Sequence, residues 1–344
     1  MKWDFCVGNP AYQDQTLGDN KGFAPPIYDK FIDAACEIAD KVEMIHPARF
    51  LFNAGSTPKA WNEKMLNDPH FKILYFEQDS GKVFSNTDIK GGVAVSYRDA
   101  KKDYGAIKHF IVFDELRQIA KKVDTKSQNS LSNIIFAAES YRFTEKMHID
   151  FPKAVDFLSK GHKYDLKSNV LETLGNVVFF EKVPSNKDEF VQIFGIGKAG
   201  RIYRWIKEDY IVPPANFKKY KVFVPKANGS GALGEVLSTP VIGQPVIGHT
   251  QSFISIGSFD TEAEATALMK YVKSKFCRVL LGILKITQDN PKSKWAYVPL
   301  QDFTENSDIN WNTSIANIDK QLYKKYGLSQ EEIDFIETHV KEMV

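Results

Sequence analysis

A side-chain amide and an aromatic ring follow the first apolar run of the chain. Residues 3–7 are typical of a strand buried on both faces, and Asn9, Pro10 and Tyr12 come next in a stiff turn. In open α/β sheets, ligands bind outside the carboxyl ends of the strands. The Asn9 oxygen and the Pro10 carbonyl can both accept hydrogen bonds from one exocyclic amino group, whose lone pair is then free to attack an electrophilic methyl group. Tyr12 can stack on the base that carries this amino group. The same residues also suit an ordinary Asn-Pro turn.

The elements that would position this turn alternate between strand and helix. Pro25-Pro26 precedes an apolar stripe at helical spacing, made of Ile27, Phe31, Ile32, Ala35, Ile38 and Ala39. Strands are expected at 42–46 and 73–76, with a helical stretch around 61–66 between them, and an antiparallel strand is expected within 91–97. This alternation predicts an α/β fold with parallel winding.

The character of the sequence changes after residue 115. A passage rich in Lys, Ser and Asn at 121–130 is typical of a domain linker. Beyond it, short strands are expected near 177–180, 191–194, 222–224 and 253–256, and helices at 131–142 and 261–284. Helices are also expected within 313–343, where Gly327 ends one and Ser329 with Glu332 forms a capping box for the next. We therefore expect three parts, 1–115, 116–304 and a helical tail at 305–344.

Charge is unevenly distributed along the 344 residues. The totals of 45 Lys and Arg against 43 Asp and Glu exclude a uniformly basic surface. However, residues 190–230 carry eight bases and two acids, residues 270–294 carry seven bases and one acid, and aromatic residues lie between the first group of cations. This pattern predicts phosphate contacts, although a solvated Lys-rich face is an alternative. The candidate DNA-binding residues are Lys198, Arg201, Arg204, Lys226, Lys273, Arg278 and Lys285.

Several other site classes are not supported. No apolar run is long enough to span a membrane and no secretory signal is present, which favours a cytoplasmic protein. The seven histidines and three cysteines have no metal-ligand spacing, so no metal site is expected. Residues 195–200 read Gly-x-Gly-x-x-Gly, but bases rather than an acid follow them, which favours a basic turn over a cofactor loop. A nuclease site at Asp88-Ile89-Lys90 is disfavoured, because Asp-x-Lys occurs at four other positions.

The turn at residues 9–12 resembles the Asn-Pro-Pro-Tyr signature of N6-adenine DNA methyltransferases, with Ala11 in place of the second Pro. Further segments look like the parts of that family that follow the signature, namely 25–31, 44–51 and 82–93. Near the other end, residues 273–278, 285–288 and 298–303 are similar to the target-recognition region of bifunctional, type IIG-like restriction-modification methylases. The resemblance covers nearly the whole chain.

This resemblance implies an adenine-specific DNA methyltransferase polypeptide that acts on double-stranded DNA with S-adenosylmethionine as the methyl donor. Asn9 and Pro10 would orient the adenine amino group, and Tyr12 and Phe84 would sandwich the flipped base. The implied fold is a partial Rossmann-like methyltransferase sheet followed by a mixed α/β target-recognition domain. The alternative is a non-catalytic DNA-binding specificity subunit of a restriction-modification complex.

The resemblance starts at the catalytic signature, whereas family members carry a cofactor-binding loop and further strands before it. An apolar strand at 3–7 would then be an unprotected sheet edge, which tends to find a partner. We therefore expect a second polypeptide that supplies the cofactor-binding half, or self-association of this chain.

Overall fold

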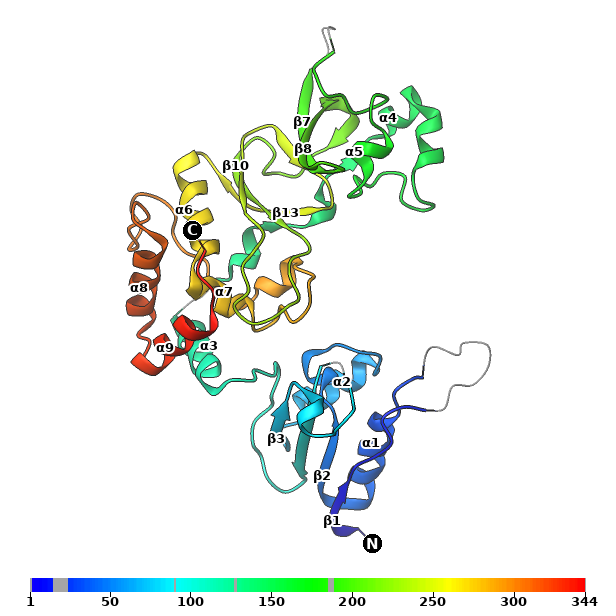
Figure 1. The fold of residues 1–344 in the computed structure, drawn as a ribbon, viewed down its shortest axis with the longest axis vertical. Coiled ribbons are helices and arrows are strands. Elements are labelled where there is room, and N and C mark those ends of the chain that lie inside the picture. The colour runs from blue at the N-terminus through cyan, green and yellow to red at the C-terminus, as the bar shows by residue number, and fades with distance from the viewer. Residues whose placement is uncertain (1, 15–23, 90, 127–128, 185–188, 344) are drawn as a thin grey trace. The chain divides into compact units, whose positions relative to one another are not determined.

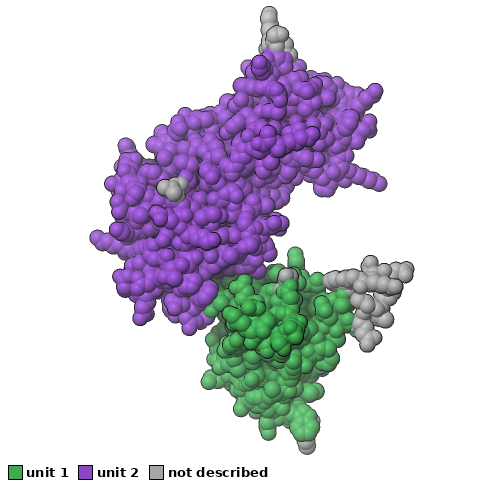
Figure 2. Space-filling view, viewed as in Figure 1, with its two compact units in different colours: residues 1–112 green, residues 113–344 purple. Residues whose placement is uncertain are grey.

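The chain forms two compact units in a computed structural model, residues 1–112 and residues 113–344 (Figures 1 and 2). The structure describes residues 2–14, 24–89, 91–126, 129–184 and 189–343. Both units combine helices with sheets, which confirms the mixed α/β class. The sequence placed a boundary at 115/116 and a separate tail at 305–344, whereas the structure divides the chain at 112/113 and includes residues 305–344 in the second unit.

The first unit is built on a four-stranded sheet with the order β1-β2-β4-β3. Its strands are β1 (Trp3–Gly8), β2 (Ala39–Pro47), β3 (Phe71–Glu77) and β4 (Val93–Asp99). β1 and β2 are parallel, and β4 is antiparallel to both β2 and β3. β1, β2 and β3 therefore run in one direction, as the alternating pattern predicted, and β4 is the expected antiparallel strand.

Helices α1 (Tyr28–Ile38) and α2 (Lys59–Asn67) pack with one face of this sheet. Their core residues are Tyr28, Ile32, Ala35, Trp61, Met65 and Leu66. The predicted stripe of α1 was too wide, because Phe31 and Ile38 are 45% and 51% exposed. The buried positions recur at four- and three-residue steps, so they form one narrow face, and Phe31 and Ile38 fall beside it.

The edge strand β1 is not buried on both faces, and that prediction was wrong. Cys6 packs against the core with α1, but the alternate residues Trp3 and Val7 are 72% and 69% exposed. Phe5 lies between them and its ring is 6.1 Å from that of Tyr97 on β4. Among the strands that the structure describes, β1 is the outer one of the sheet and pairs with β2 alone.

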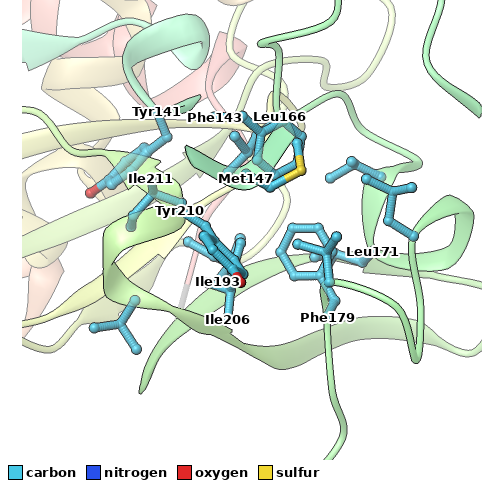
Figure 3. Close-up of a cluster of buried hydrophobic side chains, with 14 of the residues drawn as sticks. Tyr141, Phe143, Met147, Leu166, Leu171, Phe179, Ile193, Ile206, Tyr210 and Ile211 are labelled. Atoms are coloured by element: carbon cyan, nitrogen blue, oxygen red, sulfur yellow. The ribbon is translucent and has the colours of Figure 1, made fainter. Parts of the chain in front are cut away.

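The second unit contains two larger sheets and a two-stranded one, with the orders β11-β10-β13-β5, β12-β7-β8 and β6-β9. Their strands are β5 (Ile135–Phe136), β6 (Arg142–Phe143), β7 (Phe190–Gly197), β8 (Gly200–Lys207), β9 (Ile211–Val212), β10 (Tyr220–Pro225), β11 (Val241–Gly243), β12 (Ile247–His249) and β13 (Phe253–Phe259). Phe194, Phe223 and Phe253 form a cluster that joins β7 to β10 and β13. A larger core packs beside β7 and β8 and includes Tyr141, Met147, Leu171, Phe179 and Ile193 (Figure 3).

Helices complete the second unit: α3 (Asp114–Lys126), α4 (Glu145–Asp150), α5 (Val170–Thr173), α6 (Glu262–Lys273), α7 (Lys275–Leu281), α8 (Ile315–Tyr326) and α9 (Gln330–His339). The predicted linker is largely helical, since α3 buries Leu116, Ile119 and Val123; Ser127 and Gln128 lie outside the described residues. The helix expected at 131–142 is instead a series of short turns and strands. The helix expected at 261–284 is interrupted at Ser274, whose side chain caps α7.

The C-terminal helix boundaries were predicted correctly. Gly327 ends α8 in a left-handed conformation with φ of 63°, which glycine adopts without strain. Ser329 and Glu332 form the capping box of α9. In the part of the chain that the structure describes, no helix is both long and apolar enough to cross a membrane.

Candidate active site

Three loops of the first unit lie at the same end of the sheet, beyond the carboxyl ends of its parallel strands. They follow β1, β2 and β3, which run in the same direction, so their carboxyl ends lie together. The first loop carries Asn9 and Tyr12, the second begins at Arg49, and the third carries Phe84. The topology therefore brings the predicted catalytic turn and the predicted base-stacking residue to the same end of the sheet.

The predicted catalytic turn is held between β2 and the start of α1. Gly8 lies against Met44 of β2, since a Cβ on Gly8 would be 3.0 Å from the Met44 sulfur. The Tyr12 carbonyl accepts a hydrogen bond of 3.2 Å from the Ile27 amide. Asn9 is exposed, so its side-chain amide can reach a ligand from solvent.

Phe84 lies in a loop that is organised by the buried side chain of Ser80. The Ser80 hydroxyl donates to the Thr87 carbonyl at 3.1 Å and accepts from the Ile89 amide at 2.8 Å. The Phe84 amide donates to the Ser80 carbonyl at 2.8 Å. Sequence reasoning did not identify Ser80; the only local signal is Asp79, whose carboxylate accepts from the Gly81 amide in an Asx turn.

The structure brings Tyr12 and Phe84 into contact. Their ring centroids are 6.5 Å apart and their planes meet at 61°, an edge-to-face arrangement. The Tyr12 hydroxyl is buried and has no hydrogen-bond partner among the described residues. Burial raises the pKa of this phenol, so Tyr12 is neutral at physiological pH. The pair forms an aromatic contact beside the exposed Asn9.

His46, near the end of β2, is a core residue. It is fully buried, its Nε2 is 2.8 Å from the Ser96 hydroxyl, and its ring stacks on Tyr28 at 6.0 Å. Burial lowers its pKa to about 4, so the ring is neutral near pH 7. A buried, neutral and hydrogen-bonded histidine supports the fold and does not reach solvent.

The glycine-rich segment of the second unit is the tip of a β-hairpin. Gly197 pairs with Gly200 across a turn at Lys198 and Ala199, and no helix follows the turn. The Lys198 amide donates to the Glu172 carboxylate at 3.2 Å. A cofactor loop of this type joins a strand to a helix, so the segment does not have the required form.

Five of the predicted DNA-binding residues lie on or near the surface of the second unit. Lys198 and Arg201 are exposed, and the Arg201 guanidinium donates to the Thr239 carbonyl at 2.6 Å and lies 5.6 Å from the Phe253 ring. Arg204 and Lys226 form ion pairs with Glu181 and Glu139 at 3.0 and 2.8 Å. Lys273 is half-buried at the end of α6.

Arg278 and Lys285 do not belong to this surface, which corrects their assignment. Both side chains are almost completely buried. Arg278 donates to the carbonyls of Lys273, Gly234, Glu235 and Lys341, and Lys285 donates to the carbonyls of Asn228 and Thr287 and to the Glu235 carboxylate. Because their donors are used inside the protein, these cations stabilise the fold and cannot contact a phosphate. A charge count does not distinguish buried from exposed cations.

No metal site emerges from the described residues, where no group of three or more His, Cys, Asp and Glu side chains is placed to hold an ion. Of the residues considered for a nuclease, Lys90 lies outside the described residues. Glu77, which a nuclease site would use as an acid upstream of Asp88, accepts a hydrogen bond from the Asp79 amide at 2.9 Å and lies 3.6 Å from the Lys82 amine.

Comparison with known proteins relates the first unit to DNA methylases. Residues 1–84 match the model of a family described as Eco57I restriction-modification methylase. A protein of Mycoplasma pneumoniae, named an uncharacterized adenine-specific methylase, is 23% identical over 161 residues, which is 46% of this chain and 38% of that protein. The chain thus aligns with less than half the length of this relative.

Two solved structures align with 98% of this chain at low TM-scores. One is the type IIG restriction endonuclease BpuSI, at 10% identity, 54% of its own chain and a TM-score of 0.33. The other is the type IIL restriction-modification enzyme MmeI in complex with DNA, at 11% identity, 56% of its own chain and a TM-score of 0.38.

Proposed function

We propose that this chain is an adenine-specific DNA methyltransferase polypeptide of a restriction-modification system. It would transfer a methyl group from S-adenosylmethionine to N6 of an adenine that is flipped out of double-stranded DNA. The observation that carries this proposal is the contact between Tyr12 and Phe84 beside the exposed Asn9, within the segment that matches the methylase family model.

Asn9 and Pro10 act on the acceptor side of the reaction. The Asn9 side-chain oxygen and the Pro10 carbonyl accept hydrogen bonds from the two N–H groups of the adenine amino group. These two hydrogen bonds turn the lone pair of the nitrogen out of conjugation with the ring. The methyl donor, when bound, would supply a methyl group whose bond to the sulfonium sulfur breaks, and the sulfur would leave as a neutral thioether. As the new N–C bond forms, the positive charge that develops on the nitrogen is stabilised by these two acceptors, and the amino group then loses one proton to solvent.

Tyr12 and Phe84 hold the extruded base, and their present arrangement is a closed one. A base between two rings needs both faces roughly parallel to it, whereas these planes meet at 61°. At least one ring must therefore rotate when the base enters. Rotation of Tyr12 would also expose its buried hydroxyl, which has no partner among the described residues, so part of the cost of opening is offset.

The second unit would hold the DNA around the target. Lys198 and Arg201 at the β7–β8 hairpin are the first candidates for phosphate contacts, because both are exposed. Arg204, Lys226 and Lys273 are the next candidates; the first two would exchange a surface carboxylate partner for a phosphate, an exchange that costs little. A two-stranded antiparallel hairpin is also an element that the major groove of DNA accommodates.

The exposed edge at β1 is the place for a further polypeptide. Parallel strands are usually covered on both faces, yet Trp3, Phe5 and Val7 are exposed here. These exposed side chains and the outer position of β1 support binding of a second polypeptide at this edge, which would supply the cofactor-binding half. Association of two copies of this chain through β1 is the alternative.

The test is the transfer of labelled methyl from S-adenosylmethionine to unmethylated genomic DNA by the full chain, alone and together with a polypeptide that supplies the cofactor-binding half. Asn9→Ala should abolish transfer and leave DNA binding intact, whereas Asn67→Ala, which removes an exposed amide at the end of α2, should leave both unchanged. Equal transfer by wild type and Asn9→Ala would contradict the role of the turn. DNA binding without transfer, even with a partner polypeptide present, would favour a non-catalytic specificity subunit.

A further inference from the structure

Arg49 lies at the same end of the sheet as the catalytic turn. The loop that carries Phe84 fixes its position. It begins the short 3-10 turn Arg49–Phe52 directly after β2. The preceding Ala48 amide donates to the Gly92 carbonyl at 2.9 Å, and Pro47 pairs with Val93 at the start of β4. The position of Arg49 is therefore fixed against the last residues of the Phe84 loop.

Two glycines make room for the Arg49 side chain. Both Gly55 and Gly91 have a φ of 90°, a conformation that favours glycine. A Cβ on Gly91 would lie 2.5 Å from Cγ of Arg49, and a Cβ on Gly55 would lie 3.3 Å from its Cβ and 3.5 Å from its Nε. The stem of Arg49 is thus packed between two backbone segments. Such packing lowers the entropy that the guanidinium loses when it binds a ligand.

The charge of Arg49 is available to a ligand. Arg49 is exposed, and among the described residues no carboxylate lies within ion-pair distance of its guanidinium. By contrast, Arg98 pairs with Asp68 at 2.6 Å and Lys101 pairs with Asp40 at 2.7 Å. A held stem with an unpaired planar head is suited to bidentate recognition of an anion that comes from outside the chain.

We propose that Arg49 binds a backbone phosphate of the DNA strand that carries the target adenine. This inference rests on the proposed function, because it takes the extruded base at Asn9 as its reference point. A nucleotide turned out of the duplex brings its flanking phosphates close to the residues that hold the base, and Arg49 is an exposed cation at the same end of the sheet. Arg49 would then be a positioning residue, which holds the strand while Asn9 and Pro10 orient the amino group.

The experiment measures the salt dependence of DNA binding by the full chain, without methyl transfer. An unmethylated adenine-containing duplex is titrated at several NaCl concentrations with wild type, Arg49→Gln and Arg49→Lys. Lys101→Gln is the matched control, because it removes one exposed charge that follows β4, at the opposite end of the strands from Arg49. Circular dichroism and thermal unfolding confirm that each variant is folded.

Arg49→Gln should weaken binding about tenfold at low salt and reduce the slope of log K against log salt by about one, the value for one lost phosphate contact. Arg49→Lys should keep most of the slope, and Lys101→Gln should match wild type. An unchanged slope in Arg49→Gln, with binding retained, would overturn the inference and leave the proposed function intact.

Two other results would also decide the question. If Arg49→Gln leaves the DNA slope unchanged but raises the S-adenosylmethionine concentration for half-maximal transfer, Arg49 binds the carboxylate of the methyl donor and the inference is wrong. If the wild-type chain shows no binding to DNA, the proposed function itself fails and the inference fails with it.

Discussion

The rings of Tyr12 and Phe84 lie 6.5 Å apart in an edge-to-face contact, although the two residues belong to different loops of the chain. Tyr12 is in the turn after β1, and Phe84 is in the loop that joins β3 to β4. The parallel direction of β1 and β3 places both loops at one sheet edge. The two residues that were expected to hold a base therefore meet in the folded chain.

Removal of either ring should weaken the capture of an extruded base. We expect Tyr12→Ala or Phe84→Ala to lower the rate of methyl transfer by about five- to a hundredfold, since stacking on one aromatic side chain contributes about 1–3 kcal/mol per base. The measurement is single-turnover transfer, together with the fluorescence of a duplex that carries 2-aminopurine at the target position. Tyr75→Ala is the control, because Tyr75 is an exposed aromatic residue of the same unit on β3. Wild-type rates in both ring variants would contradict base stacking.

The sequence predicted the first unit better than the second, for physical reasons. Apolar runs bounded by glycine and proline indicated β1 to β4 and α1, because regular alternation of strand and helix has a strong periodic signal. Residues 131–142 instead form very short strands that depend on distant partners, such as the pairing of β5 with β13. Local pattern does not contain that information.

The candidate site shows the same division. Asn9 and Tyr12 were predicted from their place after a strand, and Phe84 from the resemblance to a known family. Arg278 and Lys285 were misassigned, because their carbonyl and carboxylate partners come from segments far away in the sequence. Gly91 and Ser80 act through tertiary contacts with Arg49 and the Phe84 loop, and neither residue type signals such a role by itself.

Gly91→Ala should reproduce the effect of losing Arg49. The new Cβ would lie 2.5 Å from the Arg49 Cγ, and φ of 90° is unfavourable for alanine, so the side chain of Arg49 must move. We expect a loss of about 1–2 kcal/mol in the free energy of unfolding and a reduced salt slope of DNA binding. Gly105→Ala is the control, because Gly105 has φ of 80° but its Cβ would contact nothing within 4 Å. Equal salt slopes in the two variants would show that the packing of Arg49 does not matter.

Exposed and buried cations of the second unit should behave differently when they are removed. Lys198→Gln should reduce the salt slope of DNA binding and leave stability unchanged, because Lys198 is exposed at the hairpin tip. Arg278→Ala should lower the free energy of unfolding by about 2–4 kcal/mol, because it leaves buried carbonyls unpaired. Urea unfolding and duplex titration of both variants test this. A salt slope that falls in folded Arg278→Ala would restore that residue to the DNA-binding surface.

The exposed apolar side chains of β1 should drive association of the purified chain. We expect Trp3→Ser combined with Val7→Ser to shift the chain towards monomer in sedimentation velocity experiments, because these side chains are 72% and 69% exposed at a sheet edge. Ile149→Ser is the control, since Ile149 is 71% exposed on α4 in the second unit. A wild-type chain that is monomeric at all concentrations would show that β1 does not bind another copy. The same double variant should then be tested for loss of binding to a second polypeptide.

Acidification should destabilise the first unit through His46. Its pKa is lowered from 6.5 to about 4 by burial, so the unfolded chain takes up a proton at a higher pH than the folded chain does. The stabilising contribution is therefore complete above the unfolded pKa and is lost as the pH falls towards the folded value. Between about pH 7.5 and about pH 5 the loss should be about 2 kcal/mol.

Urea unfolding of wild type and His46→Gln at these two pH values isolates this contribution. The variant should begin less stable, because a packed ring and its hydrogen bond to Ser96 are lost, but its stability should change less with pH. The pH dependence of the second unit can be compared with that of the first, because two of its buried groups titrate with opposite effects on stability. Burial lowers the pKa of His249 to about 4 and raises that of Asp319 to about 6, so their effects on stability oppose each other in this range. An equal pH dependence in wild type and His46→Gln would mean that His46 is not held neutral in the folded chain.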